Sequence, residues 1–437
     1  MTQRGLGTAI ALAFLMFFVP ERAHALQPLE AFIRSGRTKS PDNAEARANL
    51  TQQQGVADAT LGRVLPGLSA RGNYLRNQYQ SIVEFPNLLD PTQPAQRVTI
   101  QPFNQLTGSA TLTVPLIDLA GFVRTAAQYS AAEGFAKQAE ATALQVESLV
   151  VQDYFQLLAN LSLVVSSERA LEVARESLRL AQAQQAAGRA TLLDVDRAIA
   201  EVERQVQFLA TAKLQVALSA RALESASGLT PESLVPVPFE DDLHEEPDLA
   251  SFSPPDPALP SIAAAMKLTE SANRLAVAQK LTLFPTVAGT FTESGTNASG
   301  FVGHHYSWQA GVGFTWQFDL TTIANMRSQD AFADAARARE QRARLAARDA
   351  IYRFWQTVHS DIATSRSARA QAKATAHAAR LAADRYQAGA ATQLDLLQAE
   401  RDAYAADVAR IQSDADLANA RNQLRLATGI DPFIAAQ

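Results

Sequence analysis

Nine residues of this chain occur twice in nearly the same form, as AGRATLLDV at 187–195 and as AGAATQLDL at 388–396. The glycine, threonine and aspartate of the stretch recur 201 positions later, and the same offset relates Asp118 to Asp319. Upstream of Pro66 the offset becomes 219, so the first half contains eighteen additional residues. A register that is held over about 100 residues, with one insertion, indicates an internal duplication.

Each half predicts the same series of elements. A helix ends at a proline, a β-like segment follows, a long alanine-rich helix begins after Asp118 or Asp319, and a second helix returns after the glycine of the repeated stretch. The first long helix, residues 119–187, would measure roughly 100 Å at about 1.5 Å per residue. Its apolar residues recur every seven positions, as in a coiled coil: Val150, Leu157, Val164, Leu171 and Leu178. The equivalent positions of the second half are smaller, so we expect these helices to require neighbours in a bundle.

Two segments, residues 306–318 and 106–116, alternate between apolar and small polar side chains. Apolar outward and polar inward over about ten residues is typical of a transmembrane barrel strand. A soluble sandwich strand alternates in the same way, but two of the three tryptophans lie near the ends of the first segment, where aromatic rings meet lipid headgroups. The predicted membrane-interface aromatics are Tyr306, Trp308, Trp316 and Phe318.

Weaker strands are predicted at 66–79 and 284–295, which gives four strands per chain. Four strands cannot close a useful pore, because even a barrel of about eight strands is filled by its own side chains. We therefore expect strands from several chains to share one barrel. The segment 81–103 contains four prolines and the additional residues, and it predicts a long exposed loop, with 294–304 as its shorter equivalent.

The composition excludes several classes of protein. The 437 residues carry a net charge of −5 and no cysteine, which argues against a general nucleic-acid binder, a disulfide framework and a thiolate metal site. The histidines are scattered apart from the adjacent pair His304 and His305, and no phosphate-binding loop or nucleophile elbow is present. We expect no catalytic, cofactor-binding or metal site, and no enzyme.

The N-terminus predicts a secretory signal. A short polar start, an apolar run at 5–19 and the small residues Ala23 and Ala25 fit a signal peptide, and fifteen apolar residues are fewer than the roughly 20 that span a bilayer. No later segment has an uninterrupted apolar run of that length, so we expect no transmembrane helix in the mature chain. The predicted divisions are a signal peptide at 1–25, a first repeat at 26–230, an acidic proline-rich linker at 231–259 and a second repeat at 260–437.

This duplicated order resembles the TolC-like outer-membrane efflux proteins over nearly the whole mature chain. The local signatures are VPLID at 114–118, WQFDL at 316–320, the pairs Tyr154-Phe155 and Phe354-Trp355, and the two Gly-x-x-Thr-x-x-Asp turns. The resemblance implies an α+β membrane protein: a homotrimeric, twelve-stranded outer-membrane β-barrel with four strands per chain, continued into the periplasm by a coiled-coil α-helical tunnel.

The same resemblance implies a function. The chain would be the exit duct of a tripartite efflux pump or of a type I secretion system, in contact with outer-membrane lipid. Its partners would be a periplasmic adaptor (membrane fusion) protein and an inner-membrane pump of the RND or ABC type. The rival function is a soluble periplasmic coiled-coil adaptor or scaffold without a pore, which explains the long helices and the signal but not the tryptophan-flanked strands.

The repeated turns hold the candidate site. Gly188 and Gly389 can adopt the left-handed conformation that ends a helix, and the threonines that follow can cap the next helix. Asp194 and Asp395 then fall in its first turn, where they would at least favour the positive helix N-terminus. In a threefold assembly an inward-facing Asp395 would form a ring that selects cations.

The resemblance assigns further roles here. The acidic ring at the family's periplasmic aperture matches Asp395, and a second acidic ring matches Gln398, which implies weaker cation selectivity. A tyrosine that helps hold the aperture shut matches Tyr386, and its acidic partner matches Asp194. The gate arginine falls on Ala391, so we expect fewer charge-assisted bonds, or the use of nearby arginines instead: Arg189 or Arg197.

The exposed turns are also the candidate contacts with the adaptor, the alternative being simple solvated turns. They comprise Gly188, Arg189, Gly389 and Ala390.

Overall fold

The computed structural model describes residues 26–86, 94–235, 241–298, 300 and 304–429, so the expected signal peptide lies outside the described residues. The chain forms two compact units. The sheet-bearing unit contains Gly36–Val151, His244–Ala363 and the chain from Asn419, and the turn-bearing unit contains the chain up to Ser35, Gln152–Leu243 and Thr364–Ala418. Both units draw on both halves of the sequence.

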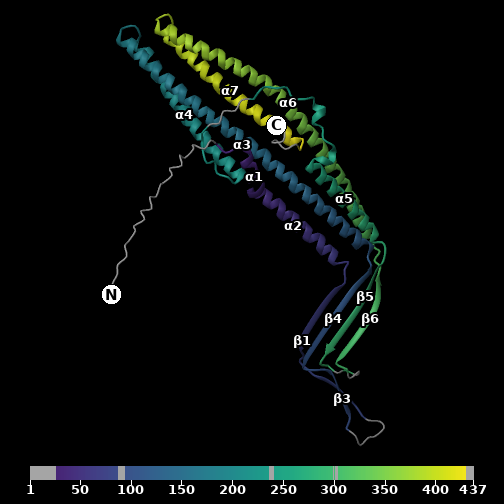
Figure 1. Cartoon of the computed structure of the whole chain (residues 1–437). Helices are drawn as coiled ribbons and strands as arrows, with labels where there is room; N and C mark the ends of the chain where they lie inside the picture. Colours follow the sequence, from purple (N-terminus) through teal and green to yellow (C-terminus); the bar gives the residue numbers. More distant parts are fainter. Residues whose placement is uncertain (1–25, 87–93, 236–240, 299, 301–303, 430–437) are drawn as a thin grey trace, which may run out of the picture. The chain divides into compact units, whose positions relative to one another are not determined.

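A four-stranded antiparallel sheet, ordered β1-β4-β5-β6, lies in the sheet-bearing unit (Figure 1). Its strands are β1 (Gly67–Arg76), β4 (Asn104–Ile117), β5 (Thr286–Thr296) and β6 (Tyr306–Thr315). All four were predicted. β1 and β6 form the two edges, and among the described strands each pairs on one side only.

The last predicted strand is shorter than expected. β6 ends at Thr315, so Trp316 and Phe318 lie beyond it. The reason is the start of the next helix, where the Asp319 carboxylate accepts hydrogen bonds from the backbone N–H of Thr322 at 2.7 Å and from its hydroxyl at 2.8 Å. Trp316 instead donates its indole N–H to the carbonyl of Leu283 at 3.0 Å.

The expected long loop at 81–103 is partly wrong, because it contains a second, two-stranded hairpin. β2 (Ser81–Phe85) pairs with β3 (Gln96–Gln101). These segments contain consecutive β-branched residues, Ile82-Val83 and Val98-Thr99-Ile100, which is a strand signal that the prolines obscured. Glu84 and Arg97 lie opposite each other in the hairpin and form an ion pair at 2.6 Å.

The helices follow the predicted order, and the two long ones both contain 68 residues. They are α1 (Leu29–Lys39), α2 (Pro41–Gly62), α3 (Leu119–Ala186), α4 (Leu192–Ser227), α5 (Pro260–Leu281), α6 (Leu320–Gln387) and α7 (Gln393–Ala427). Two short 3-10 helices, η1 (Leu249–Phe252) and η2 (Asp256–Ala258), precede α5.

Small apolar residues form the helix contacts in each unit. In the sheet-bearing unit, Ala272 and Ala276 of α5 pack against Ala333 and Ala336 of α6. Along α3 the predicted seam is buried at several positions: Val150, Tyr154, Leu157, Leu161 and Leu171. A fully buried valine or leucine contributes about 1.5–3 kcal/mol, and alanine less, so the α3 seam contributes more per residue, whereas the alanine contacts between α5 and α6 depend on close helix approach.

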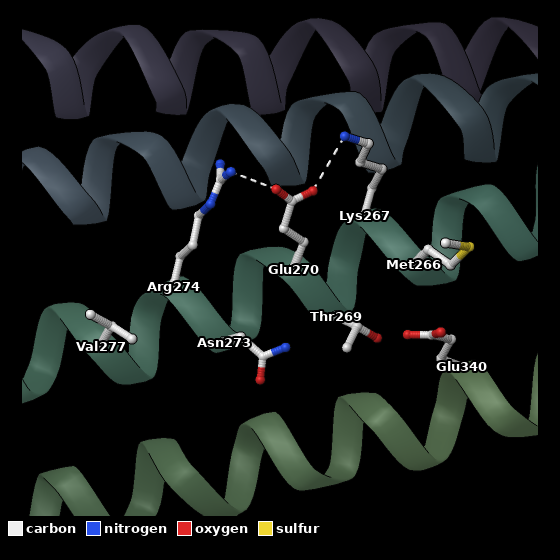
Figure 2. Close-up of a pocket in the computed structure, with 8 residues that line it drawn as sticks. All are labelled: Met266, Lys267, Thr269, Glu270, Asn273, Arg274, Val277 and Glu340. Atoms are coloured by element: carbon white, nitrogen blue, oxygen red, sulfur yellow. Dashed lines mark hydrogen bonds and ion pairs between the residues drawn. The ribbon is translucent and has the colours of Figure 1, made fainter. Parts of the chain in front are cut away.

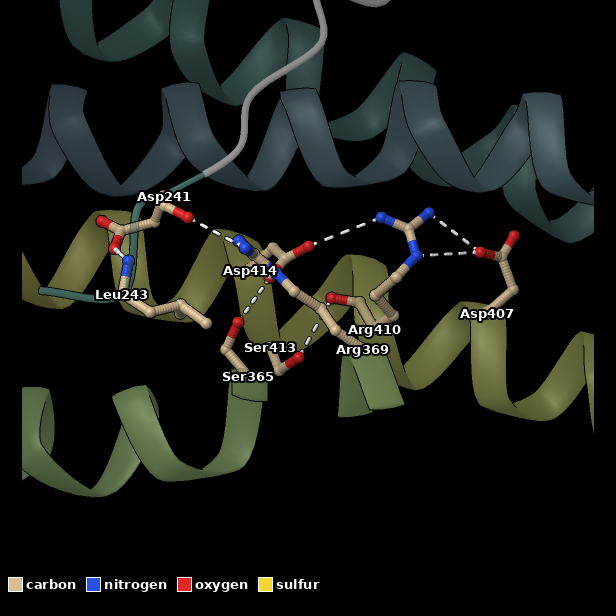
Figure 3. Close-up of polar contacts among 8 residues, drawn as sticks. All are labelled: Asp241, Leu243, Ser365, Arg369, Asp407, Arg410, Ser413 and Asp414. Carbon is tan, nitrogen blue, oxygen red and sulfur yellow. Dashed lines mark hydrogen bonds and ion pairs between the residues drawn. The ribbon is translucent and has the colours of Figure 1, made fainter. Parts of the chain in front are cut away.

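Side chains of both units bind the segment that was expected to be a linker, residues 231–259. In the turn-bearing unit, Arg369 donates to the carbonyl of Asp241 at 2.8 Å (Figure 3). In the sheet-bearing unit, Trp355 donates to the carbonyl of Pro247 at 3.0 Å, and the buried Arg421 pairs with Glu246. The described part of this segment is therefore packed against the helices.

One described helix, α3, is long and apolar enough to cross a membrane by length and composition, with an 18-residue window of mean hydropathy 1.3. In the protein, 44% of that window is buried. The buried core helix of a protein passes the same test, so this window is weak evidence for a helical span.

Candidate functional site

The two repeated turns have the same backbone geometry. Gly188 and Gly389 have φ values of 73° and 74°, in the left-handed region that glycine adopts without a steric penalty. Beyond each glycine the next N–H reaches back across the helix end: Arg189 to the carbonyl of Gln184 at 2.9 Å, and Ala390 to that of Arg385 at 2.7 Å. This is the Schellman arrangement, and it confirms the predicted helix ends.

The helices that follow are capped in the same way. The Thr191 hydroxyl accepts from the backbone N–H of Asp194 at 3.3 Å, and the Asp194 carboxylate accepts from the N–H of Thr191 at 3.0 Å. Thr392 and Asp395 repeat both bonds, at 3.2 and 3.0 Å. These capping boxes satisfy N–H groups that a helix start otherwise leaves unpaired.

The capping bonds stabilise the charged form of both aspartates. Hydrogen bonds from the backbone and hydroxyl of Thr191 hold the pKa of Asp194 below its usual value, and Arg197, with an N–O distance of 3.7 Å, lowers it further. Hydrogen bonds from Thr392 likewise lower the pKa of Asp395, which is exposed. Both carboxylates are therefore charged at neutral pH.

A cavity of about 560 Å³ separates the two turns in the turn-bearing unit. Its lining includes four residues that the sequence placed at the gate: Arg189, Asp194, Arg197 and Tyr386. Asp395 and Gln398 are not part of that lining. The geometry thus gathers the expected gate tyrosine, its acidic partner and both substitute arginines around one space, with Ala391 on the same wall.

Tyr386 is only 4% exposed, yet its hydroxyl has no hydrogen-bond partner among the described residues. Burial raises the pKa of Tyr386, and the Asp194 carboxylate raises it further, so the phenol stays protonated and able to donate. Gln393 at the start of α7 is 3% exposed, and its side-chain nitrogen and oxygen are also unpaired among the described residues. Unpaired buried polar atoms are uncommon and costly, at about 1–3 kcal/mol each.

The sequence analysis missed Asp402. Gln398 donates to the Asp402 carboxylate at 2.9 Å, and both side chains are exposed on α7. Asp402 lies seven residues after Asp395, which places the two carboxylates on one helix face. That spacing was visible in the sequence.

A second pocket lies between α5 and α6 of the sheet-bearing unit (Figure 2). The charged side chains that line it are paired with one another or with neighbouring residues, so none is available to bind a ligand. Glu270 pairs with Arg274 at 2.5 Å and with Lys267 at 3.2 Å, and Lys267 also pairs with Glu133 at 2.7 Å. These pairs are arranged as helix-surface contacts.

The aromatic residues expected at the membrane belong to the sheet-bearing unit. Tyr306, Trp308, Trp316 and Phe318 are all at least 62% exposed in the single chain. Large exposed aromatic side chains on one sheet face mark a surface that contacts lipid or protein.

The fold is that of bacterial outer-membrane channels. The chain matches a membrane protein from Pseudomonas aeruginosa (20% identity, 92% of this chain and 93% of the other, TM-score 0.77) and the Campylobacter jejuni CmeC outer membrane channel (18%, 92% and 86%, 0.77). It also matches the open state of the Neisseria gonorrhoeae MtrE outer membrane channel (18%, 93% and 90%, 0.73). No curated protein sequence matches the chain.

Residues 259–430, which cover nearly all of the second repeat, match the model of the family described as "Outer membrane efflux protein". The resemblance to the TolC-like outer-membrane efflux proteins is thereby confirmed. The second repeat is therefore similar to outer-membrane efflux proteins, and the fold of the whole chain is that of their channels, which favours an export channel over a soluble adaptor or an enzyme.

Proposed function

We propose that three copies of this chain form the exit duct of a tripartite export system, which receives its cargo through a periplasmic adaptor from an inner-membrane pump. The observation that carries the proposal is the four-stranded sheet, whose edges β1 and β6 each pair on one side only. An open sheet edge is not tolerated in lipid, because its backbone groups have no water to bond. Three sheets joined edge to edge give twelve strands and no open edge.

The two faces of the sheet support a barrel. Tyr74, Leu106, Leu112, Phe291 and Val312 all lie on the face that carries Trp308, by the strand register. The opposite face carries hydroxyl side chains. In a barrel the first face would contact outer-membrane lipid, with the aromatic residues at its borders.

At the periplasmic end, we propose that the start of α7 lines the aperture. Asp395 would supply one carboxylate per chain, and Asp402 another two turns farther along, with Gln398 between them. The expected cation preference is then stronger than Gln398 alone implied, because a second acidic residue, Asp402, is present one turn farther along the helix than Gln398.

The gate would close through bonds between copies. The Tyr386 hydroxyl is buried and has no partner in the part of the chain that the structure describes, so a neighbouring copy is the natural source of its partner. Arg189 and Arg197 line the same cavity. They would take the role of the gate arginine, whose position is occupied by Ala391 in this chain. The unpaired amide of Gln393 similarly favours contact with an adaptor at the turns.

The assembly is tested by the mass of the purified protein in mild detergent and by conductance in planar bilayers. We expect a trimer that forms discrete channels. A monomer in detergent without channel activity would overturn the proposal.

The aperture is tested in the same bilayers. We expect Asp395→Ala to reduce cation preference and Ala391→Arg to reduce conductance by adding a gate bond. Exposed Asp416→Ala, on the same helix, serves as the control. Unchanged selectivity in Asp395→Ala would place the aperture elsewhere.

Contact with the adaptor is tested by cross-linking. Because the chain has no cysteine, Ala390→Cys introduces a single thiol at the turn. We expect a cross-linked product with the adaptor from Ala390→Cys and none from the exposed Ala374→Cys in α6. Equal yields from both positions would show that the turn is not the contact.

A further inference from the structure

The polar face of the sheet carries one charged side chain. The strand register places Arg71 of β1 opposite Ser109 of β4, Ser109 opposite Ser294 of β5, and Ser294 opposite Ser307 of β6. The hydroxyls of Ser294 and Ser307 are 3.0 Å apart, which shows that their side chains share a face. Arg71 thus lies at one end of a row of three serines that crosses the whole sheet.

The other two charged residues of these four strands lie on the opposite face. Arg76 is opposite Asn104 and donates to its side-chain oxygen at 2.6 Å, beside Tyr74, and Glu293 lies between Ala110 and Trp308. Arg71 is exposed, and no carboxylate among the described residues forms an ion pair with it. The polar face therefore carries an uncompensated positive charge on a wall of neutral hydroxyl groups.

The sheet is hollowed beside this row. A cavity of about 410 Å³ is lined by Arg71, Asn73, Ser109, Ser307, His304 and His305, among others. The Nδ1 atom of His305 is 3.0 Å from the carbonyl oxygen of Thr296, which holds the imidazole in the loop next to the cavity. A guanidinium with five N–H donors, flanked by amide and hydroxyl donors, suits oxyanions and disfavours cations.

We propose that Arg71 forms a positively charged ring inside the barrel, which favours anionic solutes in the outer-membrane part of the duct. The inference rests on the proposed function, because threefold closure places the polar face in the lumen and repeats Arg71 three times at one level. Low-dielectric walls lined by one sign of charge concentrate counter-ions. The duct then carries positive charge in the barrel, from Arg71, and negative charge at the aperture, from Asp395.

Ion selectivity tests the ring in the assembled channel. Reversal potentials are measured in planar bilayers under a KCl gradient, in an Asp395→Ala parent so that the aperture does not dominate the signal. We expect Arg71→Gln to shift the reversal potential toward cation preference, and the matched control Arg76→Gln, on the same strand but the other face, to leave it unchanged. Identical potentials for the two variants would overturn the proposal.

A second test requires no conductance. Ser109→Cys gives a single thiol opposite Arg71 in the otherwise cysteine-free chain. The rates of modification by a negatively and a positively charged methanethiosulfonate are compared in the purified protein. We expect the ratio of the anionic to the cationic rate to fall by about threefold or more with Arg71→Gln, with the effect weakening at high salt.

The two tests separate the two claims. An unchanged rate ratio with Arg71→Gln overturns the inference even if the protein is a trimeric channel. A monomer without channels overturns the proposed function, and the rate ratio then reports only the local charge at Ser109. Arg76→Gln should leave the ratio unchanged in either case.

Discussion

The two long helices, α3 and α6, have equal lengths and occupy equivalent places in the duplicated sequence, but their charges are reversed at one contact. In the first half Glu168 of α3 pairs with Lys213 of α4 at 3.3 Å, and both side chains are more than half exposed. At the same offset of 201 residues, Arg369 of α6 pairs with Asp414 of α7 at 2.8 Å, and the Asp414 side chain is 2% exposed.

The difference follows from what surrounds each pair. Asp414 also accepts from Ser365 at 2.5 Å and lies 3.4 Å from Arg410, while Arg369 holds the carbonyl of Asp241 (Figure 3). Duplication preserved the backbone register and left the side chains free to change. In the second half, the arginine of the pair also binds the segment that joins the two halves.

The largest expected effect comes from removing the buried carboxylate. Asp414→Ala leaves Arg369 and Arg410 without their shared partner, and breaking a buried pair typically costs about 3–5 kcal/mol. Urea or thermal unfolding should show this loss, whereas Asp416→Ala, which removes an exposed carboxylate bonded to Gln412, should stay near wild type. Equal losses in the two variants would contradict the contrast between buried and exposed pairs.

The next effect concerns Glu400, whose counterpart in the first half is Ile199. Burial raises the pKa of Glu400 to about 7, although the Ser177 hydroxyl, which donates at 2.5 Å, opposes the shift. The nearby Glu201 carboxylate raises the pKa further.

Because the folded pKa exceeds the unfolded value, the folded state binds the proton more tightly, and stability falls as pH rises from about 4.5 toward 7. Glu400→Gln should remove this loss and stabilise the protein at neutral pH by on the order of 2 kcal/mol. Unfolding midpoints from pH 5 to 8 would show a flatter profile. A slope that Glu400→Gln does not change would place the titrating group elsewhere.

The caps at the two turns should respond alike. Thr191→Ala and Thr392→Ala each remove an N-cap hydroxyl, a change that typically costs about 1 kcal/mol. Since hydrogen bonds lower the pKa of Asp194 and of Asp395, the stability these carboxylates add is present above their ordinary pKa and is lost as pH falls through the lowered value. Hydrogen exchange at each turn would measure the two losses, and a large inequality would show that the turns differ despite their common geometry.

The smallest effect is expected at the exposed pair of the first half. Reversing it with Glu168→Lys and Lys213→Glu should change the free energy of unfolding by about 1 kcal/mol or less, because exposed ion pairs contribute little. The same exchange at Arg369 and Asp414 should be strongly destabilising, since the surrounding donors face a fixed carboxylate. If the charge reversal changed the free energy of unfolding equally at both pairs, the proposed difference between the exposed and the buried pair would be wrong.

Much of the fold was predictable, because it depends on local signals. The glycine, threonine and aspartate of each turn fix helix ends and caps within a few residues, and strand alternation sets the faces of the sheet. The β2–β3 hairpin was missed because its prolines outweighed short strand signals. The packing of the segment near Asp241 and Trp355 could not be predicted, since it depends on contacts between residues more than 100 positions apart.

Part of the candidate site was likewise predictable from the sequence, and part of it required the structure. The capping threonines and the position of Asp194 and Asp395 in the first helical turn followed from spacing, and the resemblance to a family supplied Tyr386. The unpaired hydroxyl of Tyr386 and the buried amide of Gln393 required the structure, because burial of a polar atom is a property of tertiary packing.

The hydrogen-bonded geometry of the two turns has a consequence for how fast a partner can attach. Each turn satisfies its own backbone with a Schellman bond and a capping box, so little chain ordering remains to be done on contact. Encounter should then resemble the meeting of two preformed shapes, with rates governed by diffusion and charge, and with a small entropic penalty.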